Sequence, residues 1–351
     1  MAPTVLQVDP RHPDPHVIAQ AAAALAGGGL VALPTETVYG LGANALDPEA
    51  VARIYAAKGR PAWNPLIAHV ASTAAARALA ARWPDDAERL AAAFWPGPLT
   101  IVVPRGDIVP LMVTAGLDAV AVRVPAHPVA LALLEAVQRP IAAPSANRFT
   151  QVSPTTAQHV VASLGDRVPL VLDAGPCEVG IESTVIDVSG DTPTLLRPGM
   201  ISRTALEQVL GRPVQVAATI VRADDAATPA QRAPGSGDRH YAPNADVWLF
   251  DASQAHEIAD ALRDRQARAA TGTATNTADG PVTALLTVSN VPTSSADTVV
   301  RMPATPAAYA RALYAELHAA DARGAGLVVI EQPPDDDAWR AVRDRLARAA
   351  R

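Results

Sequence analysis

The chain has 351 residues, of which 49% are apolar and 18% are charged, and its net charge is −6. This length favours two domains, and the apolar fraction is typical of packed cores rather than of disorder. The negative charge argues against tight, non-specific binding to nucleic acids, which usually needs a basic excess. The single cysteine, Cys177, excludes an intrachain disulfide and a zinc cluster built from cysteines.

The N-terminal residues 1–16 contain Pro and Asp instead of a basic start followed by an apolar stretch. They therefore do not predict a signal peptide. No apolar run has the length that a membrane span requires. We expect a cytoplasmic protein with no membrane contact.

In chain order, the first 215 residues alternate between helical and extended patterns. Helices are predicted at residues 16–26, 48–57, 74–83, 86–94, 127–137, 155–164 and 204–210. Strands are predicted at residues 30–33, 66–70, 99–103, 120–124, 141–143, 170–173, 183–188 and 194–197, the last two as a hairpin. Residues 34–42 follow the first strand as a loop rich in hydroxyls and glycine. This alternation predicts an α/β domain built on a twisted mixed sheet.

The pattern changes near residue 216, where a stretch rich in Pro, Gly and polar residues predicts a linker over residues 216–243. A second, smaller α/β domain is predicted over residues 244–351, and residues 269–280 within it have low complexity. Its strands are predicted at residues 245–250, 282–287, 298–301 and 326–331, and its helices at residues 253–268, 306–322 and 336–350.

Lysine is nearly absent: of the 29 basic residues, only Lys58 is a lysine. Arginine and lysine are not interchangeable, because one is a planar fork and the other a compact point charge. Lys58 and Arg60 flank Gly59 at the predicted end of a helix, a spacing that lets both cations reach one anion such as a polyphosphate. The alternative is a solvated basic pair and a lysine that is there by chance.

Further polar side chains lie at the ends of predicted strands, within them or in the adjoining loops, and at strand ends such residues often orient a ligand. These candidates are Thr35, Thr37, Asn64, His69, Ser145, Asn147, Ser153, Ser183 and Arg197. Arg123 lies within an apolar strand, and a buried charge there needs an anionic partner. That partner is either an internal carboxylate or a carboxylate of a substrate. No standard nucleotide-binding, zinc-protease or serine-hydrolase motif is present.

Seven segments in this order resemble the YrdC-like family of L-threonylcarbamoyl-adenylate synthases, in its long two-domain form. They are PTETVYGLGANA (34–45), KGRP with NPL (58–66), GLDAVAVRVPAHP (116–128), APSANRFTQVSPTTA (143–157), GIESTVID (180–187), LRPG (196–199) and HYAP (240–243). The family's K-x-R and S-x-N pairs are met by Lys58, Arg60, Ser145 and Asn147. The resemblance implies a twisted mixed sheet with a concave cleft, a linker, and a small Rossmann-like domain that lies over or near the cleft.

The resemblance also implies roles for single residues. Lys58 and Arg60 are expected to be catalytic. The residues expected to bind ATP are Arg60, Asn64, Ala119, Ser145, Asn147, Ser153, Arg197 and Tyr241. The residues expected to bind L-threonine are Thr35, Thr37, His69, Arg123, Ala143 and Ser183, with Arg123 pairing the carboxylate.

Two departures from the family stand out. Ala119 replaces a common threonine, so a side-chain contact with the nucleotide is lost there. Residues Ala233 to Ser236 replace the usual S-P-G-M of the linker, so the contact made by the linker is expected to differ from the family's in detail.

The implied reaction joins L-threonine, bicarbonate and ATP to give threonylcarbamoyl-AMP and pyrophosphate, the first step of a tRNA modification. Magnesium is expected to enter with the ATP phosphates, with no metal ligand from protein side chains, and a separate transferase is expected to act on tRNA afterwards. Two alternatives remain: a carbamoyl-adenylate enzyme that uses carbamoyl phosphate, and a non-enzymatic RNA-binding module.

Overall fold

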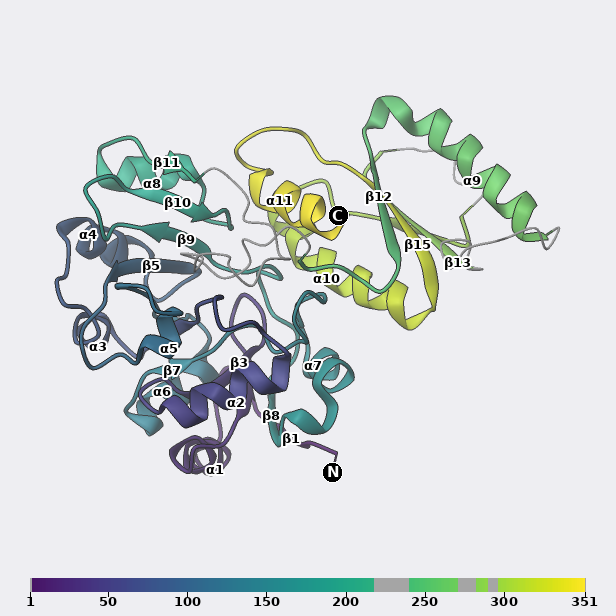
Figure 1. The fold of residues 1–351 in the computed structure, drawn as a ribbon. Coiled ribbons are helices and arrows are strands. Elements are labelled where there is room, and N and C mark those ends of the chain that lie inside the picture. Colours follow the sequence, from purple (N-terminus) through teal and green to yellow (C-terminus); the bar gives the residue numbers. More distant parts are fainter. Residues whose placement is uncertain (1, 218–239, 271–281, 290–295, 351) are drawn as a thin grey trace. The chain divides into compact units, whose positions relative to one another are not determined.

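The computed structural model describes residues 2–217, 240–270, 282–289 and 296–350 (Figure 1). The chain divides into two compact units, the first with residues 1–149 and 153–237 and the second with residues 150–152 and 238–351. Most of the predicted linker, with Ala233 to Ser236, lies outside the described residues, as does most of the stretch 269–280. The predicted domain boundaries therefore stay predictions.

The first unit holds an 11-stranded mixed sheet among the described residues, in the order β1-β8-β2-β3-β7-β4-β6-β5-β9-β10-β11. Its strands are β1 (Thr4–Gln7), β2 (Val31–Leu33), β3 (Gly40–Asn44), β4 (Ile67–His69), β5 (Leu99–Pro104), β6 (Ala119–Arg123), β7 (Ile141–Ala142), β8 (Leu170–Asp173), β9 (Thr184–Asp187), β10 (Thr194–Arg197) and β11 (Gln215–Val216). Its helices are α1 (Pro15–Ala26), α2 (Pro48–Lys58), α3 (Thr73–Arg77), α4 (Asp85–Phe94), α5 (Leu111–Thr114), α6 (Pro128–Val137), α7 (Ala157–Leu164) and α8 (Arg203–Leu210). The predicted hairpin is confirmed, since β9 and β10 pair antiparallel.

Three apolar clusters flank this sheet: two large ones, and a small one formed by Ile67, Val102, Ala121 and Val185. Successive strand residues point to opposite faces, so Ala32 belongs to one core and Leu33 to the other. Leu25 of α1 and Leu133 of α6 pack with Leu33, whereas Ile54 of α2 packs on the side of Ala32, together with residues of α4, α7 and α8. Functional side chains are commonly carried by the loops in which such strands end.

Local sequence determines where α2 ends. The Asp47 side chain caps its start by accepting from the backbone N–H groups of Glu49 and Ala50. Gly59 ends the helix with a left-handed φ of 64°, a conformation that glycine adopts without strain. Lys58 is thus the last helical residue.

Three predicted segments differ from the structure by more than two residues at one boundary. The helix predicted at 74–83 ends at Arg77, because the backbone then turns to pair Ala80 with Arg105. The helix predicted at 336–350 begins only at Arg340, because the Asp336 carboxylate accepts from the backbone N–H groups of residues 338 and 339. The loop predicted at 34–42 gives way to strand β3 at Gly40.

The second unit is a smaller α/β domain with a sheet in the order β12-β15-β13-β14, in which all described pairs are parallel. Its elements are β12 (Asp246–Phe250), α9 (Ala255–Ala270), β13 (Val282–Thr287), β14 (Thr298–Arg301), α10 (Pro306–Ala322), β15 (Ala325–Glu331) and α11 (Arg340–Ala349). Parallel strands joined by helices confirm the predicted Rossmann-like class for this domain. In the described parts of both units, no helix has the length and apolar character of a membrane span.

The first unit makes a clear prediction at Gly199, which follows β10. A Cβ atom there would lie 2.6 Å from Thr184 Oγ1, next to the Thr184 backbone, which cannot give way as a flexible side chain would. We expect Gly199→Ala to lower the free energy of unfolding by about 1–3 kcal/mol, as overpacking usually does. Urea denaturation followed by circular dichroism measures this. Gly190→Ala, at an exposed glycine with open space around its Cβ position, is the control and should stay within about 0.5 kcal/mol. Equal stability of both variants would contradict the packing described.

Candidate active site

Lys58 is buried, with 3% of its surface exposed. Its ammonium donates hydrogen bonds to the backbone carbonyls of Ser145 and Asn147, both at 2.5 Å. The predicted K-x-R and S-x-N segments therefore meet in the fold, although they are 87 residues apart. The contact joins the end of α2 to the loop after β7.

Burial lowers the pKa of Lys58 well below its usual value, and the nearby Arg60 charge lowers that pKa further, whereas Glu182 raises it. A polyphosphate bound beside this ammonium would raise the pKa again, because opposite charges favour the ionised form. Burial therefore disfavours the charged form of Lys58, and a bound anion would stabilise it.

Arg60 is fixed by the short turn that follows it. Its guanidinium donates to the Asn64 side-chain oxygen at 2.5 Å and to the backbone carbonyls of Asn64 and Pro65 at 3.1 and 2.8 Å. Asn64 is itself 1% exposed. Asn64 thus orients the guanidinium, and the two predicted ATP residues act as one unit in this structure.

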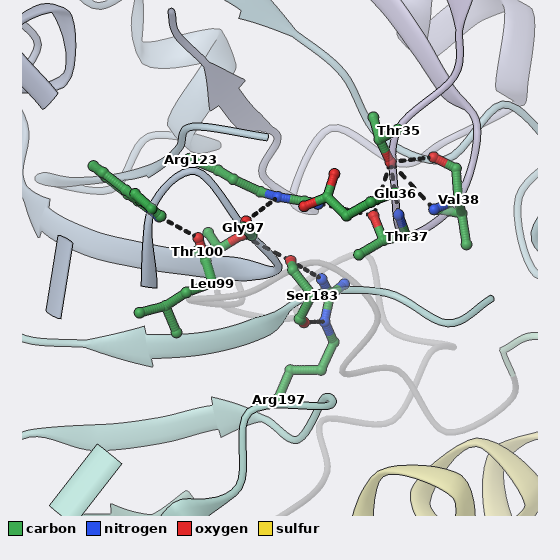
Figure 2. Close-up of polar contacts among 11 residues, drawn as sticks. Thr35, Glu36, Thr37, Val38, Gly97, Leu99, Thr100, Arg123, Ser183 and Arg197 are labelled. Atoms are coloured by element: carbon green, nitrogen blue, oxygen red, sulfur yellow. Dashed lines mark hydrogen bonds and ion pairs between the residues drawn. The ribbon is translucent and has the colours of Figure 1, made fainter. Parts of the chain in front are cut away.

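Arg123 closes a second polar cluster (Figure 2). Its Nη1 donates to Thr37 Oγ1 at 3.0 Å, and its Nε donates to the Gly97 carbonyl at 3.2 Å. Its Nη2 lies 2.6 Å from Glu36 Oε1, with only 4% of the arginine side chain and 8% of the glutamate side chain exposed. The open question of the arginine's partner is therefore answered for this structure by an internal carboxylate. Thr35 Oγ1 lies 2.9 Å from Thr37 Oγ1 and completes the cluster.

Ser183 links the start of β9 to the end of β10. Arg197 donates to the Ser183 carbonyl from Nε and to the Ser183 hydroxyl from Nη2, each at 3.1 Å. The same hydroxyl lies 2.8 Å from Thr100 Oγ1 on β5 (Figure 2). Ser183, which is predicted to bind L-threonine, is thus in direct contact with Arg197, which is predicted to bind ATP.

His69 lies at the end of β4, in register with Arg123 on the parallel neighbour β6. Burial and the nearby Arg123 charge lower the pKa of His69 to about 3. The imidazole is therefore neutral at physiological pH and serves as a hydrogen-bonding group, not as a cation.

Backbone hydrogen bonds join these loops into one cluster. The Ala146 N–H donates to the Tyr39 carbonyl at 2.8 Å, and the Gly180 N–H donates to the Thr37 carbonyl at 3.1 Å. Gly40 also forms a bridge with Ser145. The loops that carry Lys58's partners, Arg123's partners and Ser183 are therefore held together within the first unit.

Two acidic residues in the quoted motifs escaped the sequence prediction. Glu36 pairs with Arg123, and Glu182 accepts a hydrogen bond from the Ser153 hydroxyl at 2.5 Å. Both are nine-tenths buried. The signal was present, because a carboxylate that follows an apolar strand within a hydroxyl-rich loop is the expected counter-charge for a buried arginine.

Three predicted residues, Ala143, Ala119 and Tyr241, take no part in the side-chain contacts described above. Ala143, at 5% exposure, donates its N–H to the Ile67 carbonyl beside this cluster. Ala119 is half-buried at the start of β6. Tyr241 belongs to the second unit, where its ring stacks near Tyr314 and lies 5.1 Å below the Arg345 guanidinium. Its predicted contact with a nucleotide, like the other residue roles, stays a prediction.

Comparisons with known proteins agree with this geometry. The profile of the Sua5_yciO_yrdC family, described as "Telomere recombination", matches residues 23–199. A second profile, described as "Threonylcarbamoyl-AMP synthase, C-terminal domain", matches residues 201–351. The threonylcarbamoyl-AMP synthase of Bacillus subtilis is 40% identical over 95% of this chain and 92% of its own length.

The threonylcarbamoyl-AMP synthase of Pyrococcus abyssi is 51% identical over 64% of this chain, and the alignment spans just under two thirds of that relative, 65%. The crystal structure of Pyrococcus abyssi Sua5 complexed with L-threonine superposes with a TM-score of 0.85 at 38% identity, over 99% of this chain and 97% of that one. The fold and site thus define an α/β enzyme of the Sua5–YciO–YrdC family. Within that family, the chain belongs to the two-domain threonylcarbamoyl-AMP synthases.

The lowered pKa of His69 predicts a loss of stability in acid. Below about pH 6.5 the unfolded histidine binds a proton that the native one does not bind until about pH 3, so the free energy of unfolding falls as the pH drops through this window. We expect His69→Gln to remove roughly 2 kcal/mol of the difference between about pH 7 and about pH 5. Urea denaturation at both pH values measures it, and the exposed His12→Gln is the control. Equal acid sensitivity of His69→Gln and the wild type would contradict the neutral, buried imidazole.

Proposed function

We propose that the protein makes threonylcarbamoyl-AMP by adenylyl transfer, from L-threonine, bicarbonate and ATP, and is thus a nucleotidyltransferase. The observation that carries this proposal is the loop cluster in which the buried cations Lys58, Arg60, Arg123 and Arg197 meet backbone carbonyls and hydroxyl and amide side chains. The cluster suits a substrate pair with many negative charges. The L-threonine complex of the Pyrococcus abyssi relative supports the amino-acid half.

The nucleotide half of the site is assigned to the α2 end and the loop after β7. Lys58 supplies a point charge, and Arg60 supplies a guanidinium that Asn64 has already oriented. Phosphoryl and adenylyl transfer need little covalent help from a protein, so that positioning and charge stabilisation provide most of the rate. Lys58 and the pre-oriented Arg60 would supply this positioning and charge stabilisation.

The amino-acid half is assigned to the Arg123 cluster and His69. The proposed sequence begins when the threonine amine attacks bicarbonate, which forms N-carboxy-threonine and releases water. A carbamate oxygen then attacks the α-phosphorus of ATP, the bond to the β-phosphate oxygen breaks, and pyrophosphate leaves. No covalent intermediate with the protein is needed. Exclusion of water by the buried site would protect the carbamate.

Magnesium is proposed to enter with ATP, bound through phosphate oxygens. In the described ranges, no group of three or more His, Cys, Asp and Glu side chains could hold a metal ion. No step is assigned to a protein-bound ion. Magnesium bound to ATP would neutralise phosphate charge.

The product is proposed to serve tRNA modification in the cytoplasm, with a separate transferase that moves the threonylcarbamoyl group to tRNA. A mixed anhydride of a carbamate and AMP is an activated group donor, so an acceptor enzyme must follow. We propose no direct contact between this acidic chain and the tRNA, in keeping with its net charge of −6.

Pyrophosphate release from ATP tests the proposed reaction. We expect release to require both L-threonine and bicarbonate, because the nucleophile exists only after both have combined. Release without either substrate, release that carbamoyl phosphate supports instead, or no release at all would contradict the proposal.

Lys58→Ala tests the nucleotide half. We expect this substitution to lower the rate of pyrophosphate release by at least about 100-fold, since it removes a charge aimed at the phosphates. Circular dichroism should show the fold intact. Arg53→Ala removes an exposed cation from the same helix and should leave the rate within about twofold. An active Lys58→Ala enzyme would refute the assignment of this lysine.

A further inference from the structure

The contact between Glu36 and Arg123 is close but incomplete. Glu36 Oε1 lies 2.6 Å from Arg123 Nη2, yet the geometry is not that of a hydrogen bond. Neither carboxylate oxygen of Glu36, nor Arg123 Nη2, has a hydrogen-bond partner among the described residues, although all three atoms are buried. The other guanidinium nitrogens with assigned bonds, Nη1 and Nε, are held by Thr37 and Gly97.

A buried polar group without a partner destabilises a fold by about 1–3 kcal/mol, and by more when the group is charged. Most proteins therefore satisfy such groups internally. The second unit shows how this is done: the buried Glu331 carboxylate accepts from the Thr287 hydroxyl and from the N–H groups of Val288 and Ser289, at 2.5, 2.7 and 2.8 Å. Glu36 has no such set of donors. This difference points to a ligand as the missing partner.

The chemistry of the unpartnered atoms defines that ligand. Apart from their ion pair with each other, Arg123 Nη2 has no hydrogen-bond acceptor and the Glu36 oxygens have no hydrogen-bond donors. One molecule that carries a carboxylate and an ammonium group on the same carbon atom satisfies both, and this is the zwitterion of an α-amino acid. His69 Nδ1, on the strand next to Arg123, is a fourth buried atom without a hydrogen-bond partner and would meet a side-chain hydroxyl.

We propose that Glu36 binds the α-amino group of L-threonine while Arg123 binds its carboxylate. The two side chains, paired with each other in the structure shown in Figure 2, would both turn to the inserted zwitterion. This inference rests on the proposed function and deepens it. It makes Glu36 a residue that selects L-threonine over hydroxy acids that lack an amino group. A site built around a hydrogen bond rejects an analogue that lacks the group, because its own buried atoms are then left unpaired.

Binding of two ligands by the full chain tests the proposal. L-threonine has the amino group, and 3-hydroxybutyrate keeps the carboxylate and the hydroxyl but lacks it. We expect the wild type to prefer L-threonine by at least about tenfold and Glu36→Gln to lose most of that preference, because its amide no longer carries the charge that attracts an ammonium group. Isothermal titration calorimetry measures both affinities. The Michaelis constant for ATP should stay within about twofold in the variant.

The control is Glu331→Gln, the same substitution at a buried carboxylate in the second unit, which should leave the preference for L-threonine unchanged. Three results would overturn the inference: a Glu36→Gln variant that keeps its affinity for L-threonine, one that loses affinity for both ligands in proportion, or a wild type with no preference. The second of these would show that Glu36 only supports Arg123 structurally. A wild type that binds no L-threonine at all would instead refute the proposed function.

Discussion

Burial of positive charge is the constraint on which the site depends. An isolated cation taken out of water is strongly unfavourable, so each one must find oxygen acceptors within the fold. Lys58 finds two backbone carbonyls in the loop after β7, and Arg197 finds the carbonyl and hydroxyl of Ser183. Because those acceptors lie on loops far apart in the sequence, the cations hold together the loops that form the candidate site.

The same constraint separates supporting contacts from functional ones. Hydrogen bonds to Glu331 lower its pKa in spite of the burial that raises it, as expected for a carboxylate that stabilises its own domain. Lys58 shows the opposite balance, because burial dominates and its pKa falls. Perturbed groups that the protein leaves poorly compensated tend to mark functional sites, since a ligand completes them. Lys58 is of this kind, and the Arg123–Glu36 pair has buried atoms without hydrogen-bond partners. Each lies where a substrate of complementary charge is proposed.

Much of the fold was predictable from local patterns. Strands β13 and β14 and helix α10 were predicted to the residue, because the runs 282–287 and 298–301 are rich in Thr, Val and Leu and because Pro306 marks the start of the helix. Strand β3 was missed, since Gly40 and Gly42 make a run that looks like a loop; its glycines are needed because a Cβ at Gly42 would meet Leu33 and Ile141. Helix α3 was predicted too long because tertiary pairing of Ala80 overrides the helical preference of an alanine-rich segment.

The site was predictable as a set of residue types and less so as a geometry. The lone Lys58 and the charge of Arg123 within an apolar strand both pointed correctly to buried cations. Which oxygen atoms would hold them was out of reach, because the carbonyls of Ser145 and Asn147 carry no signal in the sequence. Glu36 and Glu182 were overlooked although they stand in the motifs, since an acidic residue in a polar loop is usually solvated.

The most direct test of the account follows the carbon atom of bicarbonate. The purified protein is incubated with ATP, L-threonine and isotopically labelled bicarbonate, and the nucleotide products are identified by mass spectrometry. The account predicts one adenylate that contains AMP, threonine and a single labelled carbon, formed only when all three substrates are present. Free AMP or ADP without threonine, or an adenylate without the label, would contradict it.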